Sequence, residues 1–345
     1  MQQRLSYAST GVDIDQTDDA KRKMARSMET TDPRVLNQIG AFATLLDARF
    51  PGYAHPVLVH KSEEPGSKQK LAFAHGRHRS VCYDMVNHLI DDIIVMGAAP
   101  ISIQDVIVCG SMDGDLVNDL VDAMADACRQ QDCVLTGGET SVQPGVIPDG
   151  LYVLTASVLG VVDKERIIDG STIQAGDQVI ALASNGLHTN GYTLVRALID
   201  QQPDLLDAGV AGESFLDAVL KPHTCYFQPL RDLFAEPGLH GMAHITGGGL
   251  QDNLNRILPA HLNARIDRSA LEIPAIFHSL RKAGDLDGQD MMRTFNMGAG
   301  MVLVVAPESA NQILNHLANH NAHAYCLGEI VAGQKEVEFQ GELTW

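Results

Sequence analysis

The chain has 345 residues, 45% of them hydrophobic and 20% charged, which excludes general disorder and favours two domains. The formal net charge is -18, and the segment 84–150 holds twelve acidic residues against one base, Arg129. A surface of this sign repels nucleic-acid backbone and anionic lipid, so we exclude both as main partners. No apolar run approaches the ~20 residues of a membrane span and no signal segment is present, so we expect a cytoplasmic protein.

Short apolar runs bounded by Gly, Pro or Asp alternate with stretches whose apolar residues recur at three- and four-residue spacing. The apolar runs predict strands over 56–60, 151–162, 177–184, 241–246 and 300–307. The helical spacing predicts helices over 84–97, 113–130, 190–201, 250–258 and 308–320. This mixture indicates an α/β or α+β chain, with a domain boundary near the polar, turn-rich segment 163–177.

The expected helix over 84–97 has a broad apolar face and an acidic side. Carboxylates one or two turns apart repel each other, severely so when half buried. A hard cation relieves this repulsion, and Mg²⁺ carried in by nucleotide phosphates is the usual one. We therefore consider Asp84, Asp91 and Asp92 candidate metal ligands, while a solvated helical face explains the same pattern equally well.

Three Gly-rich turns follow strand-like runs, at LTGGET (135–140), SNGLHTNGYTLVRAL (184–198) and HITGGGLQDNL (244–254). Glycine lets the backbone approach an anion closely, and a helix N-terminus offers unpaired N–H groups. Three such turns therefore favour phosphate or nucleotide binding over ordinary helix entries. Two histidines in these turns, His188 and His244, suit a general acid/base or phosphate-binding role. The patterns GxxxxGK[ST] and GxGxxG do not occur, which disfavours a P-loop or dinucleotide fold.

Taken together, the motifs resemble the phosphoribosylformylglycinamidine cyclo-ligase family, also called aminoimidazole ribonucleotide synthetase. The resemblance covers nearly the whole chain in family order, at SYASTGVDID (6–15), MVNHLIDDIIVMGA (85–98), LTGGET (135–140), SNGLHTNGYTLVR (184–196), GMAHITGGGLQDNL (241–254), IDRSALEIPAIF (266–277) and MMRTFNMGAGMVLVV (291–305). It implies an ATP- and metal-binding dimerisation domain over 1–168 and a synthetase-like domain over 169–345. It also implies a homodimer whose N-terminal sheets close into a shared barrel.

The resemblance further implies an enzyme of purine biosynthesis that uses ATP and Mg²⁺. In this family the formamide oxygen of formylglycinamidine ribonucleotide is phosphorylated. An amidine nitrogen then attacks the activated carbon and phosphate leaves, which closes the imidazole ring. The expected partner is therefore a phosphorylated ribonucleotide-like small molecule.

The family's functional residues carry over onto four groups of positions in this sequence. The expected catalytic residues are His188, Asn190 and His244. The expected nucleotide-binding residues are Glu63, Gly66, Lys68, Gly137, Gly138 and Glu139. The substrate phosphate is expected at Thr246, Gly247, Gly248 and Gly249, and the metal at Asp84 and Asp92. Asp91, the third candidate metal ligand of this helix, stands where members of the family carry Asn.

The nucleotide loop departs from the family pattern. Members normally read TDGVGTK where this chain has SEEPGSK (62–68), so Glu63, Glu64 and Pro65 replace Asp, Gly and Val. Glu64 adds negative charge and removes backbone freedom beside the expected triphosphate. Members also carry a basic residue where Ala8 stands. Two alternatives therefore stay open: a paralogous ATP-dependent ligase or phosphotransferase, and a non-catalytic phosphate-binding partner subunit.

Overall fold

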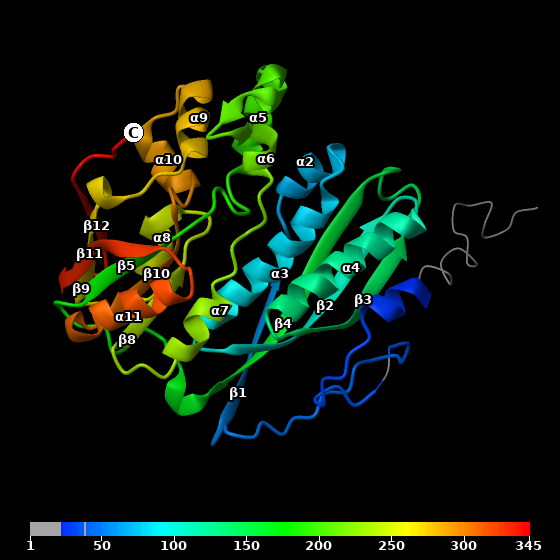
Figure 1. Cartoon of the computed structure of the whole chain (residues 1–345), viewed down its shortest axis with the longest axis horizontal. Helices are drawn as coiled ribbons and strands as arrows, with labels where there is room; N and C mark the ends of the chain where they lie inside the picture. The colour runs from blue at the N-terminus through cyan, green and yellow to red at the C-terminus, as the bar shows by residue number, and fades with distance from the viewer. Residues whose placement is uncertain (1–21, 38) are drawn as a thin grey trace, which may run out of the picture.

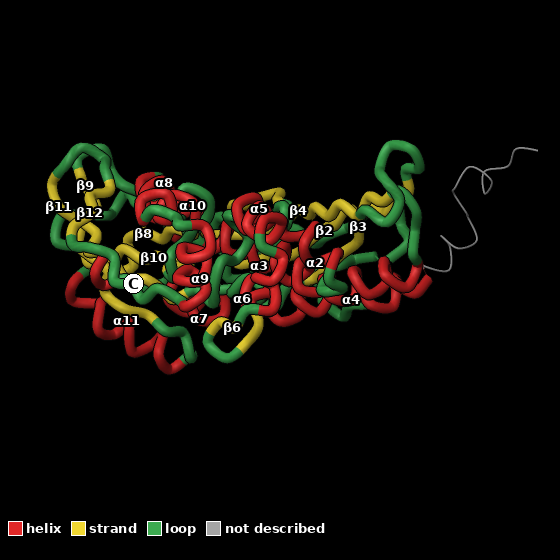
Figure 2. The backbone as a smooth tube through the Cα atoms, turned by 90° about the horizontal axis from the view of Figure 1, so that it is seen from above, coloured by secondary structure: helices red, strands yellow, loops and turns green. Residues whose placement is uncertain are grey.

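The structure is a computed structural model that describes residues 22–37 and 39–345. The family-like segment 6–15, with Ala8, lies outside the described residues. Two sheets occupy opposite ends of an elongated molecule, and helices pack between and alongside them (Figure 1 and Figure 2). Within the described ranges, no helix combines the length and apolar character that a bilayer span needs.

The first half of the chain builds a four-stranded sheet in the order β1–β4–β2–β3. Its strands are β1 (Pro56–Glu63), β2 (Ala99–Cys109), β3 (Val134–Val142) and β4 (Tyr152–Asp163). β4 runs antiparallel to β1 and β2, whereas the edge strand β3 runs parallel to β2. The helices α3 (His78–Ile94) and α4 (Gly114–Gln130) pack on each other and on one face of this sheet, after the short α2 (Lys68–Ala74).

The second half builds a six-stranded sheet in the order β12–β9–β11–β5–β10–β8. Its strands are β5 (Gln178–Ala183), β8 (Leu239–His244), β9 (Leu262–Asp267), β10 (Ala299–Val305), β11 (Ala324–Ala332) and β12 (Val337–Gln340). Its helices are α5 (Tyr192–Gln201), α6 (Phe215–Val219), α7 (Phe227–Leu230), α8 (Gly249–Asn255), α9 (Ala275–Gly284), α10 (Gly288–Thr294) and α11 (Pro307–Asn319). The short strands β6 (Gly209–Val210) and β7 (Glu213–Ser214) form a hairpin beside α6.

All five predicted strands and all five predicted helices are present, with ends that shift by a few residues. The largest shift is in α3, which begins at His78, six residues before the predicted start. The prediction of a Gly-rich turn over 135–140 is wrong, because these residues lie inside β3 and pair with β2, with a shift of register between Leu135 and Gly138. Their glycines serve close strand packing, since a Cβ on Gly138 would lie 2.0 Å from the carbonyl oxygen of Asp105.

The central helix is α3, whose apolar residues pack into the core beneath the first sheet. Its acidic side does not face solvent. Asp84 and Asp91 are both fully buried, so the solvated-face explanation is wrong for these two residues. Both carboxylates point at the second half of the chain, as their hydrogen bonds show.

Lys68 connects α2, α3 and the second half through one buried ammonium group. Its Nζ donates to Asp84 Oδ1 at 2.8 Å and to the carbonyl oxygens of His188 and Lys221 at 3.1 and 2.6 Å. The side chains of Lys68 and Asp84 are both 0% exposed. Three acceptors saturate the three N–H groups of the ammonium, so in this arrangement Lys68 binds the protein itself and no phosphate.

This ion pair yields a stability prediction. Lys68→Met leaves Asp84 buried without a cation, so we expect a loss of about 3–5 kcal/mol in the free energy of unfolding. The double variant Lys68→Met/Asp84→Asn removes the stranded charge and should recover part of that loss. Denaturant titration measures both. Lys70→Met, an exposed change in the same helix, is the matched control, and an equal effect of the two lysine variants would contradict the prediction.

Candidate functional site

The predicted histidines meet where α3 contacts the second half of the chain. His244 ends β8, and its Nδ1 lies 2.8 Å from Asp92 Oδ1 on α3. The other ring nitrogen of His244, Nε2, lies 3.0 Å from Nε2 of His223. His88, also on α3, completes the group with its Nδ1 2.9 Å from the Thr189 hydroxyl. Sequence reasoning had not selected His88 and His223, because one lies on a helical face and the other in a loop.

His188 joins this group through His223 and has an unusual backbone conformation. Its φ of 59° is left-handed, which is uncommon for a non-glycine residue and concentrates at functional sites. The imidazole stacks on the His223 ring, with ring centroids 3.9 Å apart. Gly300 leaves the space for it, since a Cβ there would lie 2.7 Å from His188 Cε1. Neither ring nitrogen of His188 has a hydrogen-bond partner among the described residues.

The histidines differ in charge because their surroundings differ. Burial lowers the pKa of His188 and His223 well below the usual range, and burial with the nearby His244 lowers the pKa of His88 to about 4. Burial alone would lower the pKa of His244. The hydrogen bond to Asp92 and the negative charge of Asp92 outweigh burial, so the pKa of His244 is raised. The site therefore consists of three neutral imidazoles around an ion pair of His244 and Asp92.

The three predicted metal ligands do not converge on one point. Asp84 is held by Lys68, and Asp91 Oδ1 accepts the backbone N–H of Tyr226 at 2.8 Å, with burial raising the Asp91 pKa to about 7. Asp92 alone is partly open, with its side chain 19% exposed. Its Oδ2 lies 3.1 Å from the Lys61 ammonium, which also contacts Glu63 at 3.1 Å.

The six predicted nucleotide-binding residues lie on three parts of the first half. Register across the sheet sets Glu63, Ala156, Asp105 and Gly138 in one row, which spans about 14 Å at the usual strand spacing. Gly66 and Lys68 lie beyond this row, against the second half. A Cβ on Gly66 would lie 3.3 Å from the carbonyl oxygen of Thr189, so the loop and the histidine group are neighbours.

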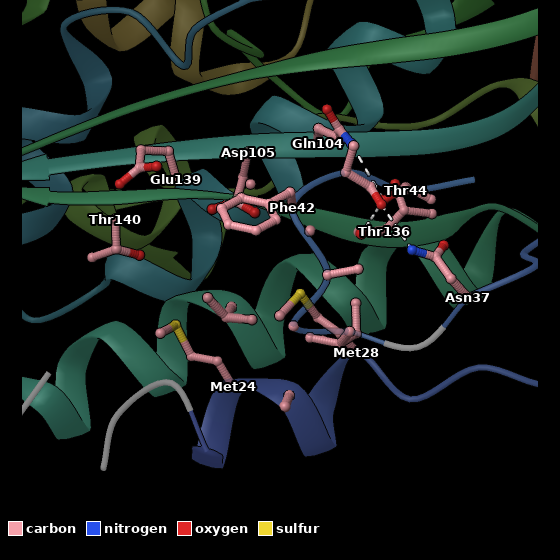
Figure 3. Close-up of a pocket in the computed structure, with 18 of the residues that line it drawn as sticks. Met24, Met28, Asn37, Phe42, Thr44, Gln104, Asp105, Thr136, Glu139 and Thr140 are labelled. Carbon is pink, nitrogen blue, oxygen red and sulfur yellow. Dashed lines mark hydrogen bonds between the residues drawn. The ribbon is translucent and has the colours of Figure 1, made fainter. Parts of the chain in front are cut away.

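A pocket of about 780 Å³ lies at the β3 end of this row (Figure 3). Gly137, Gly138 and Glu139 form one wall, beside the buried carboxyl of Asp105, whose pKa burial raises to about 7. Residues of 22–37 and 39–44 form the other wall, with Met24, Met28, Asn37, Phe42 and Thr44. The Thr44 hydroxyl donates to the Thr136 carbonyl at 2.7 Å and ties this segment to β3. Sequence reasoning missed this wall, because 22–44 has no clear apolar periodicity.

The predicted phosphate loop runs from β8 to α8. The Gly249 amide donates to the Thr246 carbonyl at 3.1 Å, and the Asn253 side chain donates to the carbonyls of Gly247 and Gly249 at 3.2 and 2.8 Å. The amides of Gly247 and Gly248 donate to no other described residue, so these two remain available for an anion. Asn190 lies beside them, because a Cβ on Gly247 would come 3.3 Å from its Oδ1.

The chain matches known families and proteins along almost its whole length. Residues 59–162 match the family described as AIR synthase related protein, N-terminal domain, and residues 174–340 match its C-terminal domain. The chain is 42% identical to a phosphoribosylformylglycinamidine cyclo-ligase of Chromobacterium violaceum, over 94% of this chain and 95% of that protein. It is 40% identical to the Carboxydothermus hydrogenoformans protein of the same name, over 97% and 98% of the two chains. The chain belongs to this cyclo-ligase family.

Solved structures with low sequence identity share the fold. Thiamine-monophosphate kinase from Stenotrophomonas maltophilia aligns with a TM-score of 0.67 at 21% identity, over 94% of this chain and 96% of that chain. The hydrogenase maturation protein HypE in complex with ATP aligns with a TM-score of 0.65 at 16% identity, over 92% and 89%. The predicted family membership is thus confirmed, together with the mixed α/β architecture.

Proposed function

We propose that this chain is an ATP-dependent cyclo-ligase that converts formylglycinamidine ribonucleotide into aminoimidazole ribonucleotide. The observation that carries the proposal is 42% identity to a cyclo-ligase over 94% of the chain. The site supports it, because a glycine loop with two available amides adjoins Asn190 and the histidine group. A phosphorylated ribonucleotide would place its phosphate on the Gly247 and Gly248 amides, since backbone N–H groups in such a loop bind anions.

The geometry assigns different roles to the three predicted catalytic residues. Asn190 is partly exposed next to the loop and is the residue that would touch the substrate. Both ring nitrogens of His244 are already engaged, by Asp92 and by His223, and His188 is fully buried. We therefore assign His188 and His244 as positioning residues that hold Asn190 and the phosphate loop.

In the reaction, the substrate oxygen bonds to the γ-phosphorus and ADP leaves. The amidine nitrogen then bonds to the carbon, a proton is lost and phosphate leaves.

The 780 Å³ pocket suits the base and ribose of ATP in size and lining. From there a triphosphate would extend across the sheet toward Glu63 and the second half. Glu63 and Asp92, near the second half, fit Mg²⁺ as ligands. Both offer carboxylate oxygens to one point, which the Lys61 ammonium occupies in this structure. Mg²⁺ bound there would neutralise phosphate charge, and Lys61 would be free to pair with a phosphate oxygen.

We also propose a homodimer formed through the open face of the first sheet, with a barrel shared across the two-fold axis. Along β1 alternate residues are exposed on the face away from α3, and Leu58 is 56% exposed there. An apolar side chain at this position suits a covered sheet face. We expect light scattering to give the dimer mass at micromolar concentration and Leu58→Asp to shift it to the monomer. A monodisperse wild-type monomer contradicts this assembly.

The phosphate loop is tested most cleanly at Gly247. Gly248 has φ of 90° and a Cβ there would lie 2.5 Å from Asp252, so changing it disturbs the fold. Gly247 has only the flexible Asn190 side chain nearby. Gly247→Ala should raise the KM for the ribonucleotide at least about tenfold, since ~1.4 kcal/mol of lost phosphate contact suffices. We expect the melting temperature to stay within a few degrees and the KM for ATP to stay unchanged.

The matched control for the loop is Gly209→Ala, because a Cβ on Gly209 would have no neighbour within 4 Å and the φ of this residue is not left-handed. It should leave both KM values unchanged. An unchanged ribonucleotide KM in Gly247→Ala would remove the loop from the phosphate site. Absence of any ring-closing activity in the wild type would instead overturn the proposed function.

Measurements of ATP binding test whether the altered loop 62–68 still binds the nucleotide. We expect Mg-ATP binding in calorimetry, none with EDTA, and at least about tenfold weaker binding in Glu63→Gln, which loses a charged metal ligand. Glu64 is exposed, so solvent and salt screen its charge, and Glu64→Gly should change affinity by no more than about threefold. If the wild type ignores millimolar Mg-ATP yet binds the ribonucleotide, the partner-subunit alternative replaces the enzyme.

A further inference from the structure

We propose that His188, His223 and His244 form a binding site for one transition-metal dication of the Zn²⁺ type. This site adjoins the place proposed for Mg²⁺, because Asp92 contacts both, and it does not rest on the proposed function. The three residues come from the loop after β5, the segment before α7 and the end of β8. All three are buried, and each offers a ring nitrogen within 4.8 Å of the other two.

The spacing of the ring nitrogens suits a shared ion. Four ligands around tetrahedral Zn²⁺, at Zn–N distances of about 2.0–2.1 Å, lie about 3.3 Å from one another. The Nε2 atoms of His223 and His244 are 3.0 Å apart, close to that spacing. Asp91 Oδ2 lies 3.4 Å from the same Nε2 of His223, next to the three histidines but outside the group whose ligand atoms are mutually close. His188 is stacked on His223, so its ring must turn to direct a nitrogen at an ion held by His223 and His244.

Several polar atoms of this cluster lack a partner, which points to something the protein alone does not supply. Both ring nitrogens of His188, Nδ1 of His223 and Oδ2 of Asp91 are buried without a hydrogen bond among the described residues. A buried unsatisfied polar atom costs about 1–3 kcal/mol, and native proteins hold few of them. A single dication would bind one nitrogen of His188 and so give that buried ring a partner.

The surroundings of His244 match those of a metal-bound imidazole. Its Nδ1 faces Asp92 Oδ1 at 2.8 Å, which orients the ring and leaves Nε2 directed at His223. A carboxylate that accepts from the second ring nitrogen is the common support of a zinc-binding histidine. Three imidazoles favour Zn²⁺, Co²⁺, Ni²⁺ or Cu²⁺ over Mg²⁺, which prefers oxygen ligands. The carboxylates of Asp91 and Asp92 offset the charge of the ion.

A direct test uses the full chain stripped of metal with a chelator and then dialysed. We expect calorimetry to show one Zn²⁺ per chain, and Co²⁺ to give the visible absorption of a tetrahedral histidine site. Mg²⁺ at millimolar concentration should displace neither ion. His223→Gln should weaken Zn²⁺ binding at least about tenfold, because it removes a ligand. His261→Gln, a change at an exposed histidine outside the cluster, should bind as the wild type does.

Several outcomes would overturn the site. One is no Zn²⁺ binding to the wild type at tens of micromolar, and another is a Co²⁺ spectrum without tetrahedral bands. Equal Zn²⁺ affinity in His223→Gln and the wild type would place the ion elsewhere. If His223→Gln does not fold, His188→Gln replaces it, since the His188 ring nitrogens make no hydrogen bonds to lose. Unchanged Zn²⁺ affinity in that variant also refutes the site.

Discussion

Two buried carboxylates on α3 hold the halves of this molecule together. Asp84 Oδ1 accepts the His223 backbone N–H at 2.7 Å, and Asp91 Oδ1 accepts the Tyr226 N–H at 2.8 Å. Seven residues apart on a helix, the two acids lie on one face and bind one short segment of the second half. Separating the halves would strip both carboxylates of these partners and remove two of the three acceptors of Lys68, the carbonyls of His188 and Lys221. This contact fixes where α3 presents His88 and Asp92 to the residues of the second half.

The same contact divides the acids of α3 by function. Asp84 and Asp91 accept hydrogen bonds from the backbone of the segment 223–226, and Asp84 also pairs with Lys68. These contacts offset the repulsion between the carboxylates of α3 that the sequence predicts. Asp92, one residue further along, points toward Lys61 and His244 at the edge of the site. Adjacent residues of one helix thus serve different purposes, because a rotation of about 100° separates their side chains.

The sequence predicted the elements that carry a simple repeat and two of the three Gly-rich loops; the third, 135–140, lies inside β3. β5, β8 and β10 are apolar runs, and the loops after β5 and β8 hold His188 and the glycines where expected. It did not predict the partners of Asp84 or the pocket wall formed within 22–37 and 39–44, because both arise from contacts between distant segments. The sequence did not identify His223 as a site residue for the same reason. Its neighbours in space, His188 and His244, are distant in sequence, and no local pattern joins them.

The altered nucleotide loop shows which of its positions the fold requires. Gly66 keeps a left-handed φ of 64° close to the Thr189 carbonyl, and Lys68 is held by three acceptors, so both retained residues have structural roles. Pro65 is buried, where its fixed φ stiffens the turn. Glu63 pairs with Lys61, and Glu64 projects into solvent. The added charge therefore lies where screening is strongest, and a loop altered in this way keeps its fold and its contact with the histidine group.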